Sequence, residues 1–446
     1  MDKDLIQGNV SKSLIYFSIP LIVGNLLQQL YNIMDTLIVG KYLGSQALAA
    51  VGSSFTLMTF LTSIILGLCM GSGVLFSMLY GAQDHDHLKI SFFVSFVSIG
   101  ILSILIEMIC VLAIDPILHF LNIPQDVYQQ THAYLIIVFS GVVFTFIFNY
   151  FSSLLRALGN SKTPLYFLAV SAVVNIVLDI VFIANLHLGI QGAALATVIA
   201  QGLSAVGLSL YVVKKQKDIL PQKKHCHFDK TIFCKIQSFS LLTCLQQSIM
   251  NFGILMIQGL VNSFGVVTMS AFTVAVKIDA FAYMPVQDFG NAFSTFIAQN
   301  KGAGKYQRIQ EGIRQGFWLS GIFCVIISLL IFMNAAGLMK IFIDSHEMEI
   351  IRQGVQYLRI EGTLYLGIGW LFLLYGYYRG IGQPGMSVVL TVVSLGTRVI
   401  LSYALAPVYG TVIIWASIPI GWLLADIIGI AVMKKKKGNI TDGKYD

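Results

Sequence analysis

Two carboxylates and an amide stand in stretches of this sequence that are otherwise apolar. Asn175 and Asp179 lie four residues apart in NIVLDIVFI (175–183), and Asp35 lies in YNIMDTLIVG (31–40). Residues four apart share one face of a helix. Carboxylate, amide and hydroxyl oxygens together could ligate a hard cation such as Na⁺. Alternatively, two adjacent carboxylates could hold a proton, because like charges cannot both ionise cheaply in a dry site.

These residues fall at similar depths in their apolar stretches. With 1.5 Å of rise per residue, Asp35 and Asp179 each lie roughly 7 Å below the outer boundary of the membrane. Asn175 and Thr197 lie at roughly 12 to 13 Å by the same estimate. Ionisable groups at such positions are costly and are usually functional or paired. The sequence therefore predicts a cation-coupling site, which would hold Na⁺ if the protein is sodium-coupled, made of Asp35, Asn175, Asp179 and Thr197.

A second set of charged residues occurs in the later apolar stretches: Lys277, Asp279, Asp288, Glu361 and Arg398. Buried charges of both signs mostly neutralise each other. We therefore favour a paired structural cluster for this set over a substrate site. Two further acids, Glu107 and Asp426, lie nearer the ends of their stretches, so we expect them at the membrane interface.

The elements that carry these residues are predicted to be membrane-spanning helices. The chain has 446 residues, of which 56% are hydrophobic and 11% charged, and its mean hydropathy is +0.79. This composition excludes a soluble globular protein. Apolar stretches of about 20 residues can cross a bilayer as helices. We predict an all-α membrane protein with twelve such helices, near 13–40, 47–80, 89–113, 128–155, 164–184, 189–213, 236–262, 267–299, 311–333, 352–378, 386–406 and 410–433.

The second half of the sequence is predicted to be a diverged copy of the first. Gly81-Ala82 recurs as Gly302-Ala303, 221 residues later, and RALG at 156–159 recurs as RGIG at 379–382. An even number of helices per copy gives both copies the same orientation, as in transporters whose two bundles share a central site. The predicted domains are a six-helix lobe at 1–213, a basic cytoplasmic linker at 214–235, a second six-helix lobe at 236–433 and a cytoplasmic tail at 434–446.

The charge distribution predicts the orientation of the chain. The net charge of +7 comes largely from 214–235 and from the KKKK of 434–437. With both termini cytoplasmic, Lys and Arg gather on the inner side, as the positive-inside rule requires. We interpret these charges as facing anionic lipid and expect no nucleic-acid partner.

Other chemistries find little support in the sequence. No GxxxxGK[ST] motif occurs, so direct use of ATP is not expected, and no cofactor other than the coupling ion is predicted. The stretch HCHFDKTIFC (225–234) does not have the spacing of a zinc site. An intramembrane prenyl transferase would need an acidic DDxxD-type motif, which is absent, and a channel is disfavoured because a two-lobe repeat gives no ring of identical segments. The chain is therefore not expected to be an enzyme.

Several motifs resemble the multidrug and toxic compound extrusion (MATE) family. They are PLIVGNLLQQLYNIMDTLIVG (20–40), RALGNSKTP (156–164), the paired Gly-Ala turns and MPVQDFGNAFSTFIAQNKGAG (284–304). The resemblance covers essentially the whole chain. It implies two pseudo-symmetric six-helix lobes in a V-shaped, alternating-access exporter of organic cations. It also implies coupling to Na⁺ or H⁺ at Asp35, Asn175, Asp179 and Thr197. Sodium-linked members carry a Glu in span 7, where this chain has Gln246 and Gln247.

Together these observations predict a secondary active multidrug exporter in the bacterial plasma (inner) membrane. We expect a multi-pass monomer whose partners are lipophilic organic cations and the lipid bilayer. The alternative is a flippase for lipid-linked precursors, a related two-bundle architecture. That alternative predicts a strongly cationic cleft, whereas this sequence has few basic residues within its spans.

Overall fold

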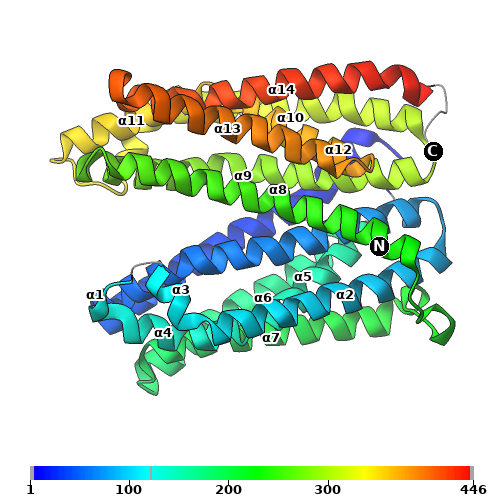
Figure 1. The fold of residues 1–446 in the computed structure, drawn as a ribbon, viewed down its shortest axis with the longest axis horizontal. Helices are drawn as coiled ribbons and strands as arrows, with labels where there is room; N and C mark the ends of the chain where they lie inside the picture. Colours follow the sequence, from blue (N-terminus) through cyan, green and yellow to red (C-terminus); the bar gives the residue numbers. More distant parts are fainter. Residues whose placement is uncertain (1–4, 121–122, 442–446) are drawn as a thin grey trace. The chain divides into compact units, whose positions relative to one another are not determined.

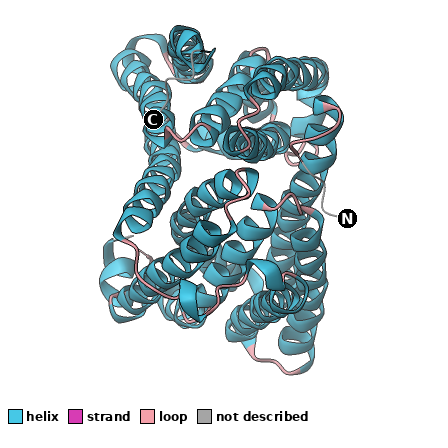
Figure 2. Cartoon of the chain, turned by 90° about the vertical axis from the view of Figure 1, so that its right-hand side faces the viewer, coloured by secondary structure: helices cyan, strands magenta, loops and turns pink. Residues whose placement is uncertain are grey.

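A computed structural model describes residues 5–120 and 123–441, and this part of the chain is built from α-helices and short loops without strands (Figure 2). The all-α prediction is confirmed. The helices are α1 (Val10–Gly81), α2 (His85–Leu112), α3 (Ile114–Phe120), α4 (Gln125–Phe139), α5 (Val142–Ala157), α6 (Lys162–Asp179), α7 (Gly189–Lys215), α8 (Lys230–Asn262), α9 (Val266–Gly302), α10 (Tyr306–Lys340), α11 (Met348–Gly362), α12 (Tyr365–Gly380), α13 (Pro384–Tyr409) and α14 (Thr411–Thr441) (Figure 1).

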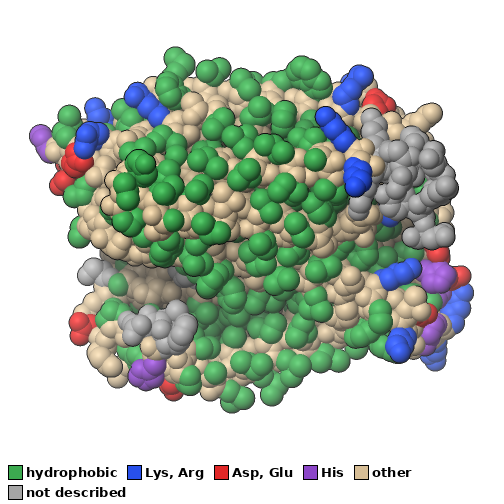
Figure 3. All heavy atoms as spheres, turned by 45° about the horizontal axis from the view of Figure 1, so that its top comes forward, with side chains coloured by type: hydrophobic (Ala, Val, Ile, Leu, Met, Phe, Trp, Pro, Cys, Tyr) green, Lys and Arg blue, Asp and Glu red, His purple; other side chains and the backbone are tan. Residues whose placement is uncertain are grey.

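Ten helical segments of the described chain are long and apolar enough to cross a membrane. The number rises to eleven when α4 and α5, which meet at a bend of 44°, count as one span. Hydrophobic side chains cover the middle of the visible face and charged side chains gather toward the helix ends (Figure 3). This distribution is what a bilayer imposes on spanning helices.

The predicted span at 352–378 is divided into two short helices. The chain leaves regular helix at Thr363 and Leu364, between α11 and α12. The first of these helices carries four charged side chains in 15 residues (Glu349, Arg352, Arg359 and Glu361), so it does not meet the same criteria of length and hydropathy. The predicted span at 352–378 therefore contains a break between α11 and α12.

The chain divides into two compact units. Of the described residues, unit 1 comprises 19–244, and unit 2 comprises 5–18 and 245–441. The first turns of α1 therefore belong to unit 2, and the first turns of α8 belong to unit 1. The predicted domain ranges placed the start of α1 in the first lobe and the start of α8, from residue 236, in the second lobe.

The repeat seen in the sequence is also present in the backbone. The left-handed positions recur after 221 to 223 residues, in the pairs Gly44 and Gly265, Gln83 and Gly304, Gly159 and Gly382, and Gly189 and Gly410. The break between α4 and α5 likewise has a counterpart in the break between α11 and α12. The two halves thus turn at equivalent places, as expected of copies of one bundle.

The amino-terminal segment is held to the turn between α9 and α10 within unit 2. Arg308 donates hydrogen bonds to the carbonyl oxygens of Leu5, Gln7 and Gly8 at 2.6 to 3.1 Å. Asn300 and Lys305 donate to the carbonyl oxygens of Leu5 and Ile6. These bonds satisfy backbone acceptors that precede the helix and fix where α1 begins.

Close backbone contact fixes the start of α8 within unit 1. A side chain on Gly67 or Gly71 of α1 would collide with the backbone of α8 at Cys244 or Ser240. The hydroxyl of Ser240 also donates to the carbonyl oxygen of Leu68 at 2.9 Å. The two glycines therefore allow these helices to pack at a distance that any side chain would prevent.

Candidate functional site

A register of polar contacts between α6 and α7 positions the predicted site residues in unit 1. Toward the start of α6, Ser204 donates to the carbonyl oxygen of Phe167 at 3.1 Å. One turn further on, Ser171 donates to the carbonyl oxygen of Ala200 at 2.9 Å. The next contact in the series joins Asn175 Nδ2 to Thr197 Oγ1 at 3.4 Å. The antiparallel packing of the two helices thus places the amide opposite the hydroxyl.

Asp179 follows one turn after Asn175, at the last residue of α6. The chain then continues as a π-helical turn, Ile180–Asn185. Such insertions are rare and frequently occur at functional sites. The side chain of Asp179 is 0% exposed, although a carboxylate is among the groups least suited to burial.

The structure brings Asp35 of α1 to Asp179 of α6. The two carboxyl groups lie next to each other and interact electrostatically. Asp35 is 8% exposed and Asn175 is 2% exposed. All four predicted site residues therefore lie in unit 1 as two contacting pairs, Asp35 with Asp179 and Asn175 with Thr197.

Several oxygens of this site have no hydrogen-bond partner among the described residues. They are Asp35 Oδ1, Asn175 Oδ1 and both carboxylate oxygens of Asp179. The ion pairs found in the described part of the chain do not include either aspartate. Burial of unpaired charge is strongly unfavourable, so the site favours a bound positive charge. An all-oxygen donor set fits a proton shared between carboxyls or a hard cation such as Na⁺.

Two tyrosines that the sequence did not single out lie beside this site. Tyr31 and the buried Tyr134 are close enough to interact electrostatically with both carboxylates. Tyr31 precedes Asp35 by four residues, so helical spacing could have identified it. Tyr134 belongs to α4, and its sequence context contains no comparable signal.

A second buried cluster lies in unit 2. Asp279 of α9 is 5% exposed and Glu361 of α11 is 3% exposed, and Arg398 of α13 interacts electrostatically with both. Tyr365 lies close to Asp279 and Tyr357 lies close to Glu361, so each phenol is near one carboxyl group. Two buried carboxyl groups thus lie in the electrostatic field of one guanidinium, with two phenols nearby. Three of the five residues predicted for this cluster come together.

The other two predicted members lie elsewhere. Lys277 is exposed, although it lies only two positions before Asp279. Asp288 is buried nine residues beyond Asp279, about 13 Å further along α9. The structure therefore corrects the predicted cluster by removing Lys277 and Asp288 from it. The prediction for Lys277 rested on its place in an apolar stretch, which takes no account of the face of the helix that a residue occupies.

The expectation that Glu107 and Asp426 are interfacial is wrong for Asp426. This side chain of α14 is only 4% exposed. Glu107 is half-buried, and its Oε2 accepts a hydrogen bond from the backbone N–H of Val143 at 3.2 Å, in the first turn of α5. An anionic group at the start of a helix is favoured by the unpaired N–H groups there.

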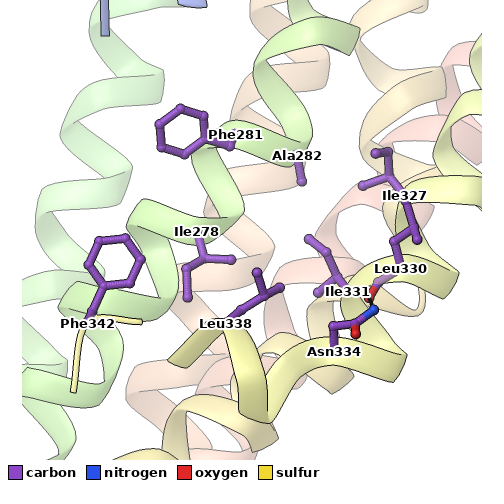
Figure 4. Close-up of a pocket in the computed structure, with 9 residues that line it drawn as sticks. All are labelled: Ile278, Phe281, Ala282, Ile327, Leu330, Ile331, Asn334, Leu338 and Phe342. Carbon is purple, nitrogen blue, oxygen red and sulfur yellow. Dashed lines mark hydrogen bonds between the residues drawn. The ribbon is translucent and has the colours of Figure 1, made fainter. Parts of the chain in front are cut away.

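An apolar pocket of about 400 Å³ lies between α9 and α10 of unit 2 (Figure 4). Ile278, Phe281 and Ala282 line it from α9, Leu330, Asn334 and Leu338 are among those that line it from α10, and Phe342 lies beyond the end of that helix. Asn334 is the one polar side chain of this lining, and its amide donates to the carbonyl oxygen of Leu330. The pocket contains no titratable group that could couple ion movement to transport.

The described residues do not place three or more His, Cys, Asp or Glu side chains where they could jointly hold a metal ion. No disulfide joins cysteines of the described residues, and Cys226 and Cys234 are exposed. The chemistry of unit 1 therefore rests on paired carboxyls with an amide and a hydroxyl.

These features define an all-α, membrane-spanning protein of two repeated units with buried carboxylates in each. The MatE family model matches residues 20–181 and 241–404, one match in each half of the chain. The chain belongs to this family of multidrug efflux transporters. Members of the family are transporters, so the prediction that the chain is not an enzyme is confirmed.

Curated relatives agree with this assignment. The chain is 30% identical to "Probable multidrug resistance protein YpnP" of Bacillus subtilis, over 88% of this chain and 87% of that protein. It is 23% identical to "Multidrug export protein MepA" of Staphylococcus haemolyticus, over 92% of this chain and 90% of that protein. Both relatives are bacterial proteins named for multidrug resistance or export.

Solved structures share the fold over nearly the full length. A MATE transporter crystallised in complex with MaL6 superposes with a TM-score of 0.92 at 21% identity, covering 98% of each chain. The outward-facing conformation of a multidrug resistance MATE family transporter superposes with a TM-score of 0.91 at 21% identity, covering 99% of this chain and 98% of the other. The predicted fold class is therefore confirmed.

Proposed function

We propose that this multidrug exporter moves lipophilic organic cations out of the cell against inflow of H⁺ or Na⁺ through a site formed by Asp35, Asn175, Asp179 and Thr197. The observation that carries the proposal is the contact between the carboxyl groups of Asp35 and Asp179 in a buried position. A site of this kind is stable only with added positive charge, so it loads a cation and empties as its surroundings change.

The mechanism follows from competition between two bound states. Cation binding at the aspartates favours one arrangement of the transporter, and binding of the drug favours the other. Each ligand shifts the population only by its difference in affinity for the two arrangements. Na⁺, when bound, would supply a compact positive charge to these oxygens. The residues of the chain hold the cation, exclude other ligands and separate the two carboxylates from water.

The cellular setting of this proposal is the bacterial plasma membrane. The relatives named above are bacterial proteins. Basic residues in 214–235 and in 434–437 favour a cytoplasmic location for both the linker and the carboxyl terminus. Each unit contains its own buried acidic cluster, so the chain needs no second copy to complete a site, and we propose that it acts as a monomer.

The test is reconstitution of the purified protein in liposomes with ethidium as the transported dye. Gradients of Na⁺ and of pH are imposed separately, so that the coupling ion is identified directly. We expect Asp179→Asn to abolish ion-driven efflux while the variant still inserts and folds. Ser402→Ala serves as a matched control, because Ser402 occupies the equivalent position of unit 2 and contacts Ser417 at 2.8 Å. Liposomes that move no dye under either gradient, but translocate a lipid-linked sugar, would replace this proposal by the flippase alternative.

A further inference from the structure

A buried carboxyl group on α14 lies apart from both acidic clusters described above. Asp426 is 4% exposed, and neither of its oxygens has a hydrogen-bond partner among the described residues. The ion pairs found in the same part of the chain also leave it out. An isolated carboxylate in such surroundings is strongly destabilising, whereas a neutral carboxylic acid costs far less.

The immediate neighbours of Asp426 come from α12. A side-chain carbon on Gly367 would lie 3.8 Å from Asp426 Oδ2 and 3.2 Å from Cβ of Trp422. The carboxyl group therefore lies near Gly367, close to the start of α12. Trp422, one turn earlier in α14, lies near the same glycine. Among residues 5–120 and 123–441, no basic side chain forms an ion pair with this acid.

The titratable and charged groups near this acid are few. On α12, Tyr375 interacts electrostatically with Asp426 and with Arg379, and the Arg379 guanidinium donates through Nη2 to Asn291 Oδ1 at 2.9 Å. On α13, Thr391 and Ser387 are hydrogen bonded to Tyr375. Glu361 of α11 and Arg398 of α13 also belong to helices that pack on α14, but their electrostatic partners are Asp279 and one another.

The repeat shows that helix packing does not require an acid at this place. The pair Gly189 and Gly410 sets an offset of 221 residues for the last helix of each half, so Asp426 corresponds to Ala205 of α7. Ala205 is 0% exposed. A small apolar side chain therefore fills the equivalent position in unit 1. Packing of the last helix of the half therefore does not require the carboxyl group of Asp426.

We propose that Asp426 is a proton-binding site of unit 2, separate from the Asp35–Asp179 pair, that is loaded and emptied during the transport cycle. The ligand is a proton because a metal cation needs several oxygen ligands, and the described residues give this carboxyl group no hydrogen-bond or ion-pair partner. Exchange of the proton changes the charge buried between α12 and α14 by one. The free energy of packing between α12 and α14 therefore depends on whether Asp426 is protonated.

The experiment counts protons on the purified protein and does not depend on which drug is transported. Wild type and Asp426→Asn are titrated in nanodiscs between pH 5 and pH 10, with proton uptake measured directly and protonated carboxyl groups followed by infrared spectroscopy. We expect the variant to bind one proton fewer and to lack one carboxyl band. Asp426→Ala, which installs the residue of unit 1, provides a second variant expected to fold, and Glu107→Gln is the matched control at a half-buried acid.

A second experiment measures dye efflux by the same variants in liposomes. We expect Asp426→Asn to reduce proton-driven dye efflux at least tenfold and to flatten its pH profile, with thermal stability equal to or above that of wild type. An unchanged proton count in both variants would overturn the proposal. Loss of one proton with unchanged efflux and pH profile would also overturn it, because Asp426 would then exchange a proton that plays no part in transport.

Discussion

Nε2 of His225 lies 2.8 Å from Oδ1 of Asp86, which joins the linker between the two halves to the start of α2 across 139 residues of sequence. His225 is 2% exposed, and its Nδ1 accepts a hydrogen bond from the backbone N–H of Gln222 at 3.1 Å. Because Nδ1 is an acceptor, the ring proton lies on Nε2 and is donated to the carboxylate. The histidine of HCHFDKTIFC thus anchors the linker in unit 1.

We expect His225→Ala to loosen the linker. The substitution removes the contact with Asp86 and leaves the Gln222 N–H without its acceptor, so residues 214–229 should be cleaved faster in limited proteolysis. His227→Ala is the control, because His227 is exposed and its ring contacts only the nearby carbonyl oxygen of Lys224. Equal cleavage rates in the two variants would show that the 2.8 Å contact does not hold the linker.

The sequence predicts well those features that depend on local spacing. Asn175 and Asp179 share a helix face whatever the rest of the fold does. The repeat of turns was also readable, because left-handed positions such as Gly159 and Gly382 favour glycine. These features require no knowledge of which helices pack together.

The sequence predicts poorly what depends on packing between distant helices. The burial of Asp426 comes from its contact with Gly367, 59 residues earlier, which no local pattern encodes. The break between α11 and α12 falls in a stretch without proline, so the apolar run reads as continuous. The first turns of α1 belong to unit 2 because the segment before them is hydrogen bonded to Arg308, which lies 300 residues away from Gly8. Each of these features is decided by tertiary contacts.

We expect Arg308→Ala to destabilise unit 2. The guanidinium donates to three backbone carbonyl oxygens of the amino-terminal segment, and hydrogen bonds from charged donors typically contribute about 1.5 to 3 kcal/mol. Partial solvent exposure reduces this contribution, so the expected loss of unfolding free energy is about 1 to 2 kcal/mol. Thermal unfolding of the detergent-solubilised protein measures it. Arg314→Ala on the exposed face of α10 is the control, and an equal loss there would contradict the role of Arg308.

The acidic cluster of unit 2 gives a prediction in which two substitutions differ. Arg398→Met leaves Asp279 and Glu361 buried beside each other without their guanidinium, and loss of one partner of a buried pair costs about 3 to 5 kcal/mol. Glu361→Gln instead leaves one carboxylate for one guanidinium, and the amide can still accept a hydrogen bond from Tyr357. We expect low expression and a lowered melting temperature for Arg398→Met, and near-normal stability for Glu361→Gln. A stable Arg398→Met protein that has lost only dye binding would show instead that Arg398 contacts the substrate.

The last prediction concerns the pair formed by Asp35 and Asp179. Each single substitution, Asp35→Asn or Asp179→Asn, removes one charge without changing the shape of the side chain, so the protein should insert and fold. We expect either substitution to reduce ion-driven efflux to background, because one carboxyl alone cannot provide the shared site. The double substitution should be no worse than either single one, since contacting residues that act as one unit are not additive. Initial rates of ethidium efflux from liposomes measure all three variants against Ser402→Ala. Two defects that multiply would mean that the aspartates act at separate steps, and retained ion-driven efflux in the double variant would transfer the coupling role to Asp279, Glu361 and Asp426 of unit 2.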